Sequence, residues 1–290
     1  MINRITVLGA GTMGHGIAHA AIAGGYATRM YDVSDAAVAK GRASIELIVK
    51  KGVDLGKISA SDADAALRRL ETTTNLAESL RDADLVIEAA PEKIDLKLAL
   101  FSEIERYAPA AAVIASNTSA LSITEIAGSL KSPPRVAGMH FFNPVHKMKL
   151  IEIVQALESA PATLEAIETV SKRMGKETVL VRESPGFITT RVNASIGNEA
   201  FYMLMEGVAS ARDIDKALKL GLNHPMGPFE LVDLVGLDTR LSILEYLHRS
   251  LGEKYRPCPL LAQYVKAGRL GKKVGKGVYE YESDGGANSR

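Results

Sequence analysis

The hydrophobic positions follow two alternating patterns over roughly the first 180 residues of the chain. Short, continuous apolar runs are typical of strands that are buried on both faces of a sheet, and they alternate with segments of helical spacing. The apolar runs predict strands at residues 5–8, 27–31, 84–88, 112–115, 135–140, 149–154 and 178–181. This alternation predicts an α/β fold with a Rossmann-type, doubly wound and mostly parallel sheet.

Helical spacing is predicted between these strands at residues 12–24, 36–51, 63–69, 95–107 and 162–174, and a further helix is expected to start near Ser122. Ser34 or Asp35 can cap the helix at 36–51, because either side chain accepts a hydrogen bond from the first helical turn.

The pattern changes after Ser184-Pro185-Gly186, where helical spacing takes over. Helices are predicted at residues 187–205, 214–219, 229–235, 237–251 and 260–267, and no convincing long strand follows. We therefore expect two domains, a Rossmann-type domain at 1–183 and an all-helical domain at 184–290. The last residues, 283–290, are expected to form a frayed tail.

Composition narrows the class of protein. The chain has 290 residues, which fits two domains, and its 47% hydrophobic and 24% charged content is ordinary for a globular protein. A net charge of +1 gives no electrostatic reason to expect a nucleic-acid or membrane partner. The single cysteine, Cys258, excludes an internal disulfide framework, and no Cys/His cluster indicates a metal site.

The chain also carries no evident targeting signal. No apolar run approaches the roughly 20 residues of a transmembrane helix. The N-terminus enters a strand without a basic segment and a cleavage site, so we expect no signal peptide. A cytoplasmic location is the resulting expectation.

The strand at residues 5–8 runs into a glycine-rich turn that opens the first helix. Gly9 permits a tight turn, Gly11 lets the backbone approach a pyrophosphate, and Gly14 lets the helix pack closely on the strand. The free N–H groups and positive dipole end of the helix would face the phosphates. The loop predicted to bind the cofactor comprises Gly9, Ala10, Gly11, Thr12, Met13 and Gly14.

Asp32 ends the next predicted strand, where an acid accepts hydrogen bonds from the ribose of a bound dinucleotide. A carboxylate here would repel a 2′-phosphate, so NAD is favoured over NADP. The alternative is a glycine-rich turn followed by a solvated aspartate. Parallel strands would bring Gly11, Asp32, Glu88 and Ser116 to one edge of the sheet, where ligands of such folds bind.

Two later strands carry candidate catalytic residues. His140 ends one predicted strand, and Glu152 lies inside the apolar run of the next, where an unpaired carboxylate is costly. If the two strands lie side by side, Glu152 fixes the tautomer of His140 and stabilises its protonated form, as a general base requires. Alternatively, Glu152 faces water on an edge strand. The segment Ser116-Asn-Thr-Ser119 supplies polar groups that either polarise a substrate oxygen or cap the helix near Ser122.

Over nearly its whole length, the sequence resembles the 3-hydroxyacyl-CoA dehydrogenases, especially the short bacterial 3-hydroxybutyryl-CoA dehydrogenase type. The resemblance rests on G-A-G-T-M-G at 9–14, I-E-A-A-P-E at 87–92, S-N-T-S at 116–119, H-F-F-N-P at 140–144, S-P-G-F at 184–187, H-P-M-G-P-F-E-L-V-D at 224–233 and G-K-K-V-G-K-G-V-Y at 271–279. It implies NAD-dependent oxidation of an (S)-3-hydroxyacyl-CoA to the 3-ketoacyl-CoA, the reverse reaction, and a homodimer formed through the helical domain.

The resemblance also implies residue roles. His140 matches the catalytic base, and Glu152 matches the carboxylate paired with it. Ser119 matches the serine that contacts the 3-oxygen of the substrate and lies near the nicotinamide ribose. The positions matched to the nicotinamide half of the cofactor are Glu88, Lys93, Asn143 and Lys273, and Asn143 is also expected near the substrate.

Two assignments stay open within this resemblance. The lysine that contacts CoA is expected on the helix after Asp32, at Lys50 or Lys51, although both can be solvated surface residues. Thr190 stands where many members have an asparagine that binds the substrate oxygen. Thr190 has a shorter reach than an amide, and Asn193, nearly one helical turn later, can take this role instead.

Two other functions remain as alternatives. One is the same fold acting on a sugar acid, as in gulonate dehydrogenase. The other is a non-catalytic NAD-binding structural protein, against which the presence of both His140 and Glu152 argues.

Overall fold

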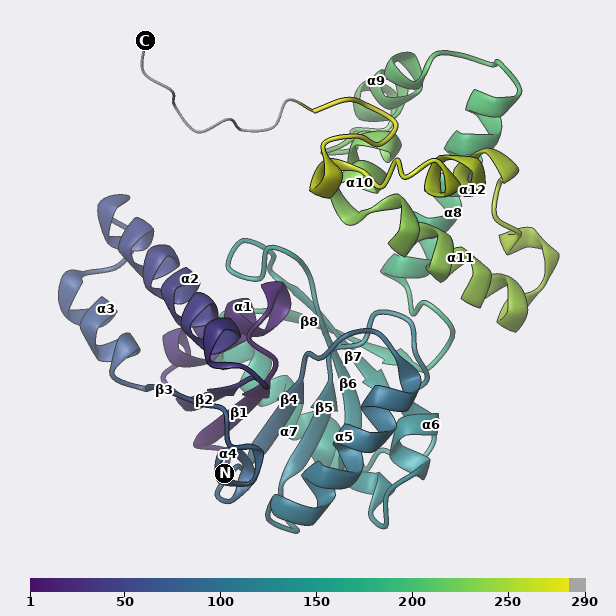
Figure 1. Ribbon diagram of the computed structural model, residues 1–290. Helices are drawn as coiled ribbons and strands as arrows, with labels where there is room; N and C mark the ends of the chain where they lie inside the picture. Colours follow the sequence, from purple (N-terminus) through teal and green to yellow (C-terminus); the bar gives the residue numbers. More distant parts are fainter. Residues whose placement is uncertain (282–290) are drawn as a thin grey trace. The chain divides into compact units, whose positions relative to one another are not determined.

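A computed structural model describes residues 1–281 and divides into two compact units, Met1–Phe187 and a second unit that begins at Ile188 (Figure 1). The boundary expected from the sequence, at residue 184, precedes this division by a few residues. The tail expected at 283–290 lies outside the described residues.

The first unit is built on one sheet of eight strands in the order β3-β2-β1-β4-β5-β6-β7-β8. Every neighbouring pair is parallel except β6 and β7, which are antiparallel. The strands are β1 (Arg4–Leu8), β2 (Ala27–Tyr31), β3 (Leu70–Thr73), β4 (Leu85–Glu88), β5 (Val113–Ser116), β6 (Val136–Phe141), β7 (Leu150–Gln155) and β8 (Glu177–Arg182). The predicted Rossmann-type fold class is therefore confirmed.

Helices cover both faces of this sheet (Figure 1). They are α1 (Thr12–Ala23), α2 (Asp35–Asp54), α3 (Ala60–Leu67), α4 (Leu76–Leu80), α5 (Ile94–Tyr107), α6 (Ile123–Gly128) and α7 (Pro161–Arg173), with a short 3₁₀ turn at Pro133–Arg135. One apolar core joins α1, α2 and α7 to one face, and a second joins α5 and α6 to the other. The strands between the two cores are buried on both sides, which explains their continuous apolar runs.

Some elements differ from the sequence prediction. Helix α2 continues to Asp54, three residues beyond the expected end at Lys51, and α3 begins earlier than expected because Ser59 caps it. Strand β3 and helix α4 were not expected at all. Only Leu70 of β3 is buried, so this edge strand lacks an apolar run, and α4 is a single short helix capped by Asn75.

The carboxyl ends of the central strands lie in register. Leu8 of β1 pairs with Glu88 of β4, and Glu88 pairs with Ser116 of β5. On β6 and β7, His140 pairs with Glu152. The polar residues identified from the sequence therefore lie together at the carboxyl ends of the parallel strands.

The second unit is helical. It contains α8 (Thr189–Met205), α9 (Ala211–Gly221), α10 (Pro228–Val235), α11 (Leu237–Leu251) and α12 (Pro259–Lys266), with 3₁₀ turns at Glu253–Tyr255 and Lys272–Val274. Its core includes Phe201, Phe229, Leu244 and Leu261, all fully buried. The buried, free cysteine Cys258 belongs to the same core.

Two buried carboxylates anchor the last described segment of this unit. Asp233 accepts hydrogen bonds from the backbone of Val278 and Tyr279 and from the Tyr281 hydroxyl. Asp215 accepts a 2.7 Å bond from the Tyr279 hydroxyl. Burial and the adjacent Asp215 carboxylate raise the pKa of Tyr279, so this hydroxyl remains a donor. The segment that carries Lys273 is thus held in place from inside the unit.

None of the described helices is long and apolar enough to span a bilayer. The described residues also contain no group of three or more histidine, cysteine, aspartate or glutamate side chains arranged to hold a metal ion.

Candidate active site

The glycine loop between β1 and α1 has a separate steric reason for each glycine. Gly9 adopts a left-handed φ of +112°, and a Cβ there would come within 2.7 Å of the Ala89 carbonyl. A Cβ on Gly14 would collide with the backbone of Gly9. A Cβ on Gly11 would meet no atom within 4 Å. Gly9 and Gly14 therefore serve the fold, whereas Gly11 keeps open space in front of the helix.

The start of α1 suits an anionic ligand. Gly11 is the N-cap residue and provides no side-chain hydrogen bond, and the first turn contains no acidic residue. The positive end of the helix dipole is therefore left for an external negative group. Thr12 is exposed and Met13 is half-buried in this turn. The loop fits the pyrophosphate of a dinucleotide, with Gly11 making the room.

Asp32 follows β2 directly and faces this loop. Its Oδ2 accepts a 2.8 Å hydrogen bond from the amide of Ala10, and its Oδ1 accepts a bond of the same length from Val33. These bonds fix the carboxylate beside the glycine loop, at the end of the second strand, where the ribose of a bound dinucleotide would lie.

Glu88 is fully buried at the end of β4. Its Oε1 accepts hydrogen bonds from the Lys97 ammonium at 2.6 Å and from the amide of Ala90 at 2.7 Å. Its Oε2 accepts a bond from the hydroxyl of Ser116. The side chain is 0% exposed, so its charge acts through these partners.

Glu92 organises the neighbouring loop. Its Oε1 accepts hydrogen bonds from the Thr118 hydroxyl and from the amides of Ser119 and Ala120. Its Oε2 lies 3.5 Å from the ammonium of Lys97. Lys97 therefore connects the carboxylates of Glu88 and Glu92. These two carboxylates hold the loop after β5, on which half-buried Ser119 lies.

Sequence reasoning missed Glu92 and Lys97 as contributors to this site. A signal for Lys97 was present. Ile94, Lys97, Phe101 and Ile104 fall at helical spacing, so Lys97 occupies the inward face of α5 among apolar residues. A lysine in that position is 1% exposed only because it has carboxylate partners.

His140 and Glu152 form the predicted pair. The His140 Nδ1 lies 2.7 Å from Oε2 of Glu152, and the side chains are 5% and 0% exposed. Strand β7 is not an edge strand, since β6 and β8 flank it, so the alternative in which Glu152 faces water is wrong. With a carboxylate at Nδ1, the nitrogen left to face a substrate is Nε2.

Further contacts place the neighbouring loops. Asn117 accepts a 2.9 Å hydrogen bond from the amide of Phe141, which ties the loop after β5 to the end of β6. Two aromatic rings lie close to the imidazole of His140, with centroid distances of 4.6 Å to Phe142 and 5.7 Å to Phe187. Asn143 is exposed just beyond β6.

Three expected site residues belong to the second unit. Thr190 and Asn193 are half-buried, three residues apart in the first turns of α8, and so lie near the same face of this helix. Lys273 donates to both carboxylate oxygens of Asp238 at 2.6 Å. Burial opposes ionisation of Asp238, but the hydrogen bonds from Lys273 and the backbone lower its pKa overall.

The lysines considered for CoA are both exposed on α2. Lys51 lies close enough to His146 for its charge to contribute to the lowered pKa of that imidazole, behind burial and the charges of Lys147, His15 and Lys176. Lys51 therefore belongs to a basic group near the loop between β6 and β7. Lys93 is exposed at the N-cap of α5.

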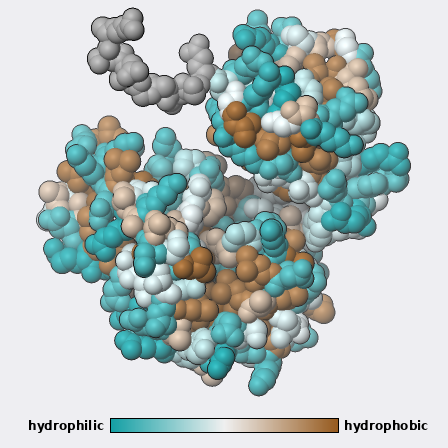
Figure 2. Space-filling view, viewed as in Figure 1, coloured by the Kyte–Doolittle hydropathy of each residue, from teal (hydrophilic) through white to brown (hydrophobic). Residues whose placement is uncertain are grey.

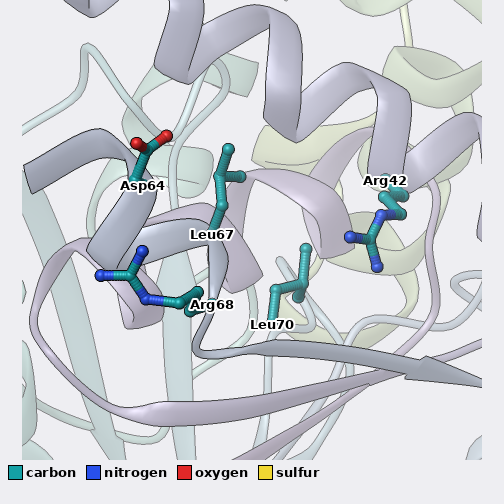
Figure 3. A pocket seen from close by; sticks show the side chains of 5 residues that line it. All are labelled: Arg42, Asp64, Leu67, Arg68 and Leu70. Carbon is teal, nitrogen blue, oxygen red and sulfur yellow. The ribbon is translucent and has the colours of Figure 1, made fainter. Parts of the chain in front are cut away.

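A separate hollow of about 360 Å³ lies between α2, α3 and β3. Leu67 and Leu70 lie between Arg42 on one side and Asp64 with Arg68 on the other (Figure 3). None of these residues belongs to the glycine loop or to the group of side chains around His140 and Glu152.

The parallel sheet, the open glycine loop and Asp32 define a dinucleotide-dependent oxidoreductase, and the His140–Glu152 pair lies at the same edge of the sheet. Comparison with known proteins narrows this class. The family model for the NAD binding domain of 3-hydroxyacyl-CoA dehydrogenase matches residues 4–184, and the model for its C-terminal domain matches residues 186–281.

Similar proteins agree with this match. A Bacillus subtilis protein named "Probable 3-hydroxybutyryl-CoA dehydrogenase" is 45% identical over 97% of this chain and 98% of its own length. The 3-hydroxybutyryl-CoA dehydrogenase of Bradyrhizobium diazoefficiens is 42% identical over 97% of this chain and 96% of its own. The crystal structure of (S)-3-hydroxybutyryl-CoA dehydrogenase from Ralstonia eutropha superposes with a TM-score of 0.94 at 42% identity, covering 98% and 100% of the two chains.

The chain belongs to the 3-hydroxyacyl-CoA dehydrogenase family. It is an NAD-dependent oxidoreductase with an NAD-binding domain of that family.

Proposed function

We propose that this protein interconverts (S)-3-hydroxybutyryl-CoA and acetoacetyl-CoA with NAD as the hydride carrier. The observation that carries the proposal is the buried His140–Glu152 pair at the edge of the sheet that also bears the glycine loop. The choice of substrate rests on the names of the similar proteins.

In the oxidation direction, Nε2 of His140 takes the proton of the C3 hydroxyl while the C3 hydride leaves. NAD, when bound at the glycine loop and Asp32, would accept this hydride at its nicotinamide ring. Glu152 accepts the hydrogen bond from Nδ1 and stabilises the imidazolium that forms. The electron pair of the broken O–H bond becomes the new C=O bond, so the product is the 3-ketoacyl-CoA. The reverse reaction returns the proton from His140 to the oxygen.

The oxygen at C3 gains negative charge in the transition state of reduction, and hydrogen-bond donors stabilise it there. We assign this role to the Ser119 hydroxyl, whose loop is held by Glu92. We assign a second donor to Thr190, with Asn193 as the alternative. Thr190→Val removes only the hydroxyl of one candidate, and Asn193→Leu removes the amide of the other, so kcat of the two variants separates them.

The remaining assignments come from the family resemblance. Asp32 would bind the adenosine ribose, and Lys93, Asn143 and Lys273 would line the nicotinamide end. Glu88 would contribute indirectly, because its buried carboxylate holds Lys97 and Ser116 rather than facing solvent. Lys50 and Lys51 are both exposed on α2, and either would bind the phosphate groups of CoA.

We also propose a homodimer in the cytoplasm. The second unit exposes several large apolar side chains, which a partner copy would cover. In the reducing environment of the cytoplasm, the free thiol of Cys258 would persist.

The test is an initial-rate screen of substrates with each nucleotide. Acetoacetyl-CoA, longer 3-ketoacyl-CoAs, 3-oxoadipyl-CoA and gulonate are assayed, the ketones with NADH and NADPH and gulonate with NAD⁺. We expect acetoacetyl-CoA with NADH to give the highest kcat/KM. A higher value with gulonate would replace the proposed substrate, and the absence of turnover with every CoA ester would support a non-catalytic role.

A further inference from the structure

The first unit ends in a turn with unusual backbone geometry. After β8, Gly186 adopts a φ of +74°, and Phe187, the last residue of the unit, adopts a φ of +52°. Glycine takes such angles freely, but a bulky side chain with a Cβ does so only under strain. Among the described residues other than glycine, Asn223 alone shares this property with Phe187. A phenylalanine here therefore requires a compensating contact.

The turn is fixed on both sides. The amide of Phe187 donates a 2.8 Å hydrogen bond to the carbonyl of Ser184. Just before the turn, the carboxylate of Glu183 accepts hydrogen bonds from the Ser122 hydroxyl and from the amide and hydroxyl of Thr124. The backbone of the turn is thus tied to the start of α6, and the direction of the Phe187 side chain follows from it.

The Phe187 ring packs both in the apolar core and against the imidazole of His140. The Phe187 ring is 3% exposed and belongs to the apolar core between the sheet and α5 and α6. Its centroid lies 5.7 Å from that of His140, and Phe142 lies 4.6 Å from the same imidazole. The hydrogen bond with Glu152 fixes the imidazole at Nδ1, and packing against neighbouring side chains must limit the tilt of the ring plane. The two phenyl rings provide the lateral contacts that limit this tilt.

We propose that Phe187 is a positioning residue for His140. It holds the imidazole plane so that Nε2 points at the substrate hydroxyl, and it keeps water away from the His140–Glu152 pair. The inference rests on the proposed role of His140 as the base. Phe142 directly follows strand β6, whereas the position of Phe187 depends on the strained turn after β8.

The test compares two losses of a buried ring in the same core. Phe187→Leu removes the ring beside His140, and Phe101→Leu removes a fully buried ring of α5 from the same apolar cluster. We expect both variants to lower the melting temperature. Only Phe187→Leu should lower kcat, by about ten- to a hundredfold, with little change in the KM for acetoacetyl-CoA or in the dissociation constant of NADH. Phe187→Tyr retains the ring and should restore most of the kcat. Phe187→Met serves as the ring-free variant if Phe187→Leu does not fold.

A double-mutant cycle with His140→Gln shows whether Phe187 acts through His140. If it does, Phe187→Leu should change the residual kcat of His140→Gln less than twofold, because the positioned group is already gone. A full, additive loss in that background overturns the inference, as does an unchanged kcat in Phe187→Leu with wild-type His140. If His140→Gln itself keeps wild-type turnover, the proposed function fails instead, so the two failures are distinguishable.

Discussion

Lys97 and Glu88 form a buried ion pair in the first unit. Both side chains are at most 1% exposed, and they meet at 2.6 Å. Removing charges from water is costly, so each of these groups depends largely on the opposite charge of the other. This pair supports the loop that carries Ser119, which connects stability to the proposed chemistry.

Lys97→Met should therefore destabilise the first unit by about 3–5 kcal/mol, because it leaves the Glu88 carboxylate buried without its counter-ion. Urea unfolding measures the change. The matched control is Lys93→Met on the exposed start of the same helix, which should change stability by less than about 0.5 kcal/mol. Adding Glu88→Gln to Lys97→Met should recover part of the loss. Equal stability of the two lysine variants would mean that the pair contributes nothing.

His19 on α1 makes stability depend on pH. Burial, followed by the charges of His146, Lys176 and His15, lowers the pKa of His19 to about 4 from 6.5. Its Nδ1 is buried and has no hydrogen-bond partner among the described residues. Between pH 6.5 and 4, the unfolded chain binds a proton at this position that the folded chain does not. This residue therefore costs no stability above pH 6.5 and progressively more as the pH falls towards 4.

We expect His19→Gln to lose less stability than the wild type on acidification, by a difference on the order of 2–3 kcal/mol at pH 4 relative to pH 7. Urea unfolding at pH 7, 5.5 and 4 gives the two curves. Parallel curves for the two proteins across this range would assign the acid sensitivity to other groups.

At the scale of elements, the sequence predicted most of the first unit because buried strands leave apolar runs. Residues 27–31 are found as predicted, and the other predicted strands are found to within one or two residues. The pairing of His140 with Glu152 was predictable for the same reason, since a carboxylate inside an apolar run needs a partner. The edge strand β3 was not predicted, because its single buried leucine does not form an apolar run.

The rest of the site could not be predicted from local patterns. The bonds of Glu92 to the loop at Thr118–Ala120 join residues that lie far apart in the sequence, and only the fold brings them together. The strained turn at Phe187 could not be predicted either, because the segment Ser-Pro-Gly-Phe does not indicate a positive φ at its phenylalanine. The roles of Thr190 and Lys273 were inferred from the resemblance to the family, and that of Asn193 from its position nearly one helical turn after Thr190.

The strand–loop–helix element β1–α1 allows a paired prediction. Gly14→Ala should prevent stable folding of this element, because the new methyl group collides with the backbone of Gly9. Gly11→Ala meets no protein atom and should leave the melting temperature unchanged. Its methyl group would occupy the space for the pyrophosphate, so NADH affinity should fall at least about tenfold. Thermal unfolding and NADH fluorescence titration measure the two effects. Unchanged NADH affinity in Gly11→Ala would place the cofactor elsewhere.

At the scale of the whole molecule, the exposed apolar residues of the second unit need an explanation. Figure 2 shows apolar patches on the surface of this unit. Apolar residues of this unit differ in burial in a way that sequence patterns alone do not reveal. Phe201 and Val232 are buried in the core, whereas Val192, Leu234 and Val235 are 54%, 48% and 41% exposed. Large exposed side chains of this kind are typical of an interface between copies.

We therefore expect light scattering at micromolar concentration to give twice the chain mass of 31.0 kDa. Val192→Asp adds a charge at one of these exposed positions and should shift the equilibrium towards the monomer. Leu157→Asp, at an exposed apolar position of the first unit, is the matched control and should leave the mass unchanged. A monomer mass for the wild type would refute the dimer.

The central claim is that His140 moves the proton of the reacting hydroxyl, and the kcat of His140→Gln with acetoacetyl-CoA and NADH tests it most directly. Glutamine keeps a polar side chain of similar size but cannot exchange a proton near neutral pH. If His140 is the base, kcat should fall about 10²–10⁴-fold, with the dissociation constant of NADH unchanged. Glu152→Gln should cause a smaller loss, because the base remains. Turnover of His140→Gln at the wild-type rate would contradict the account.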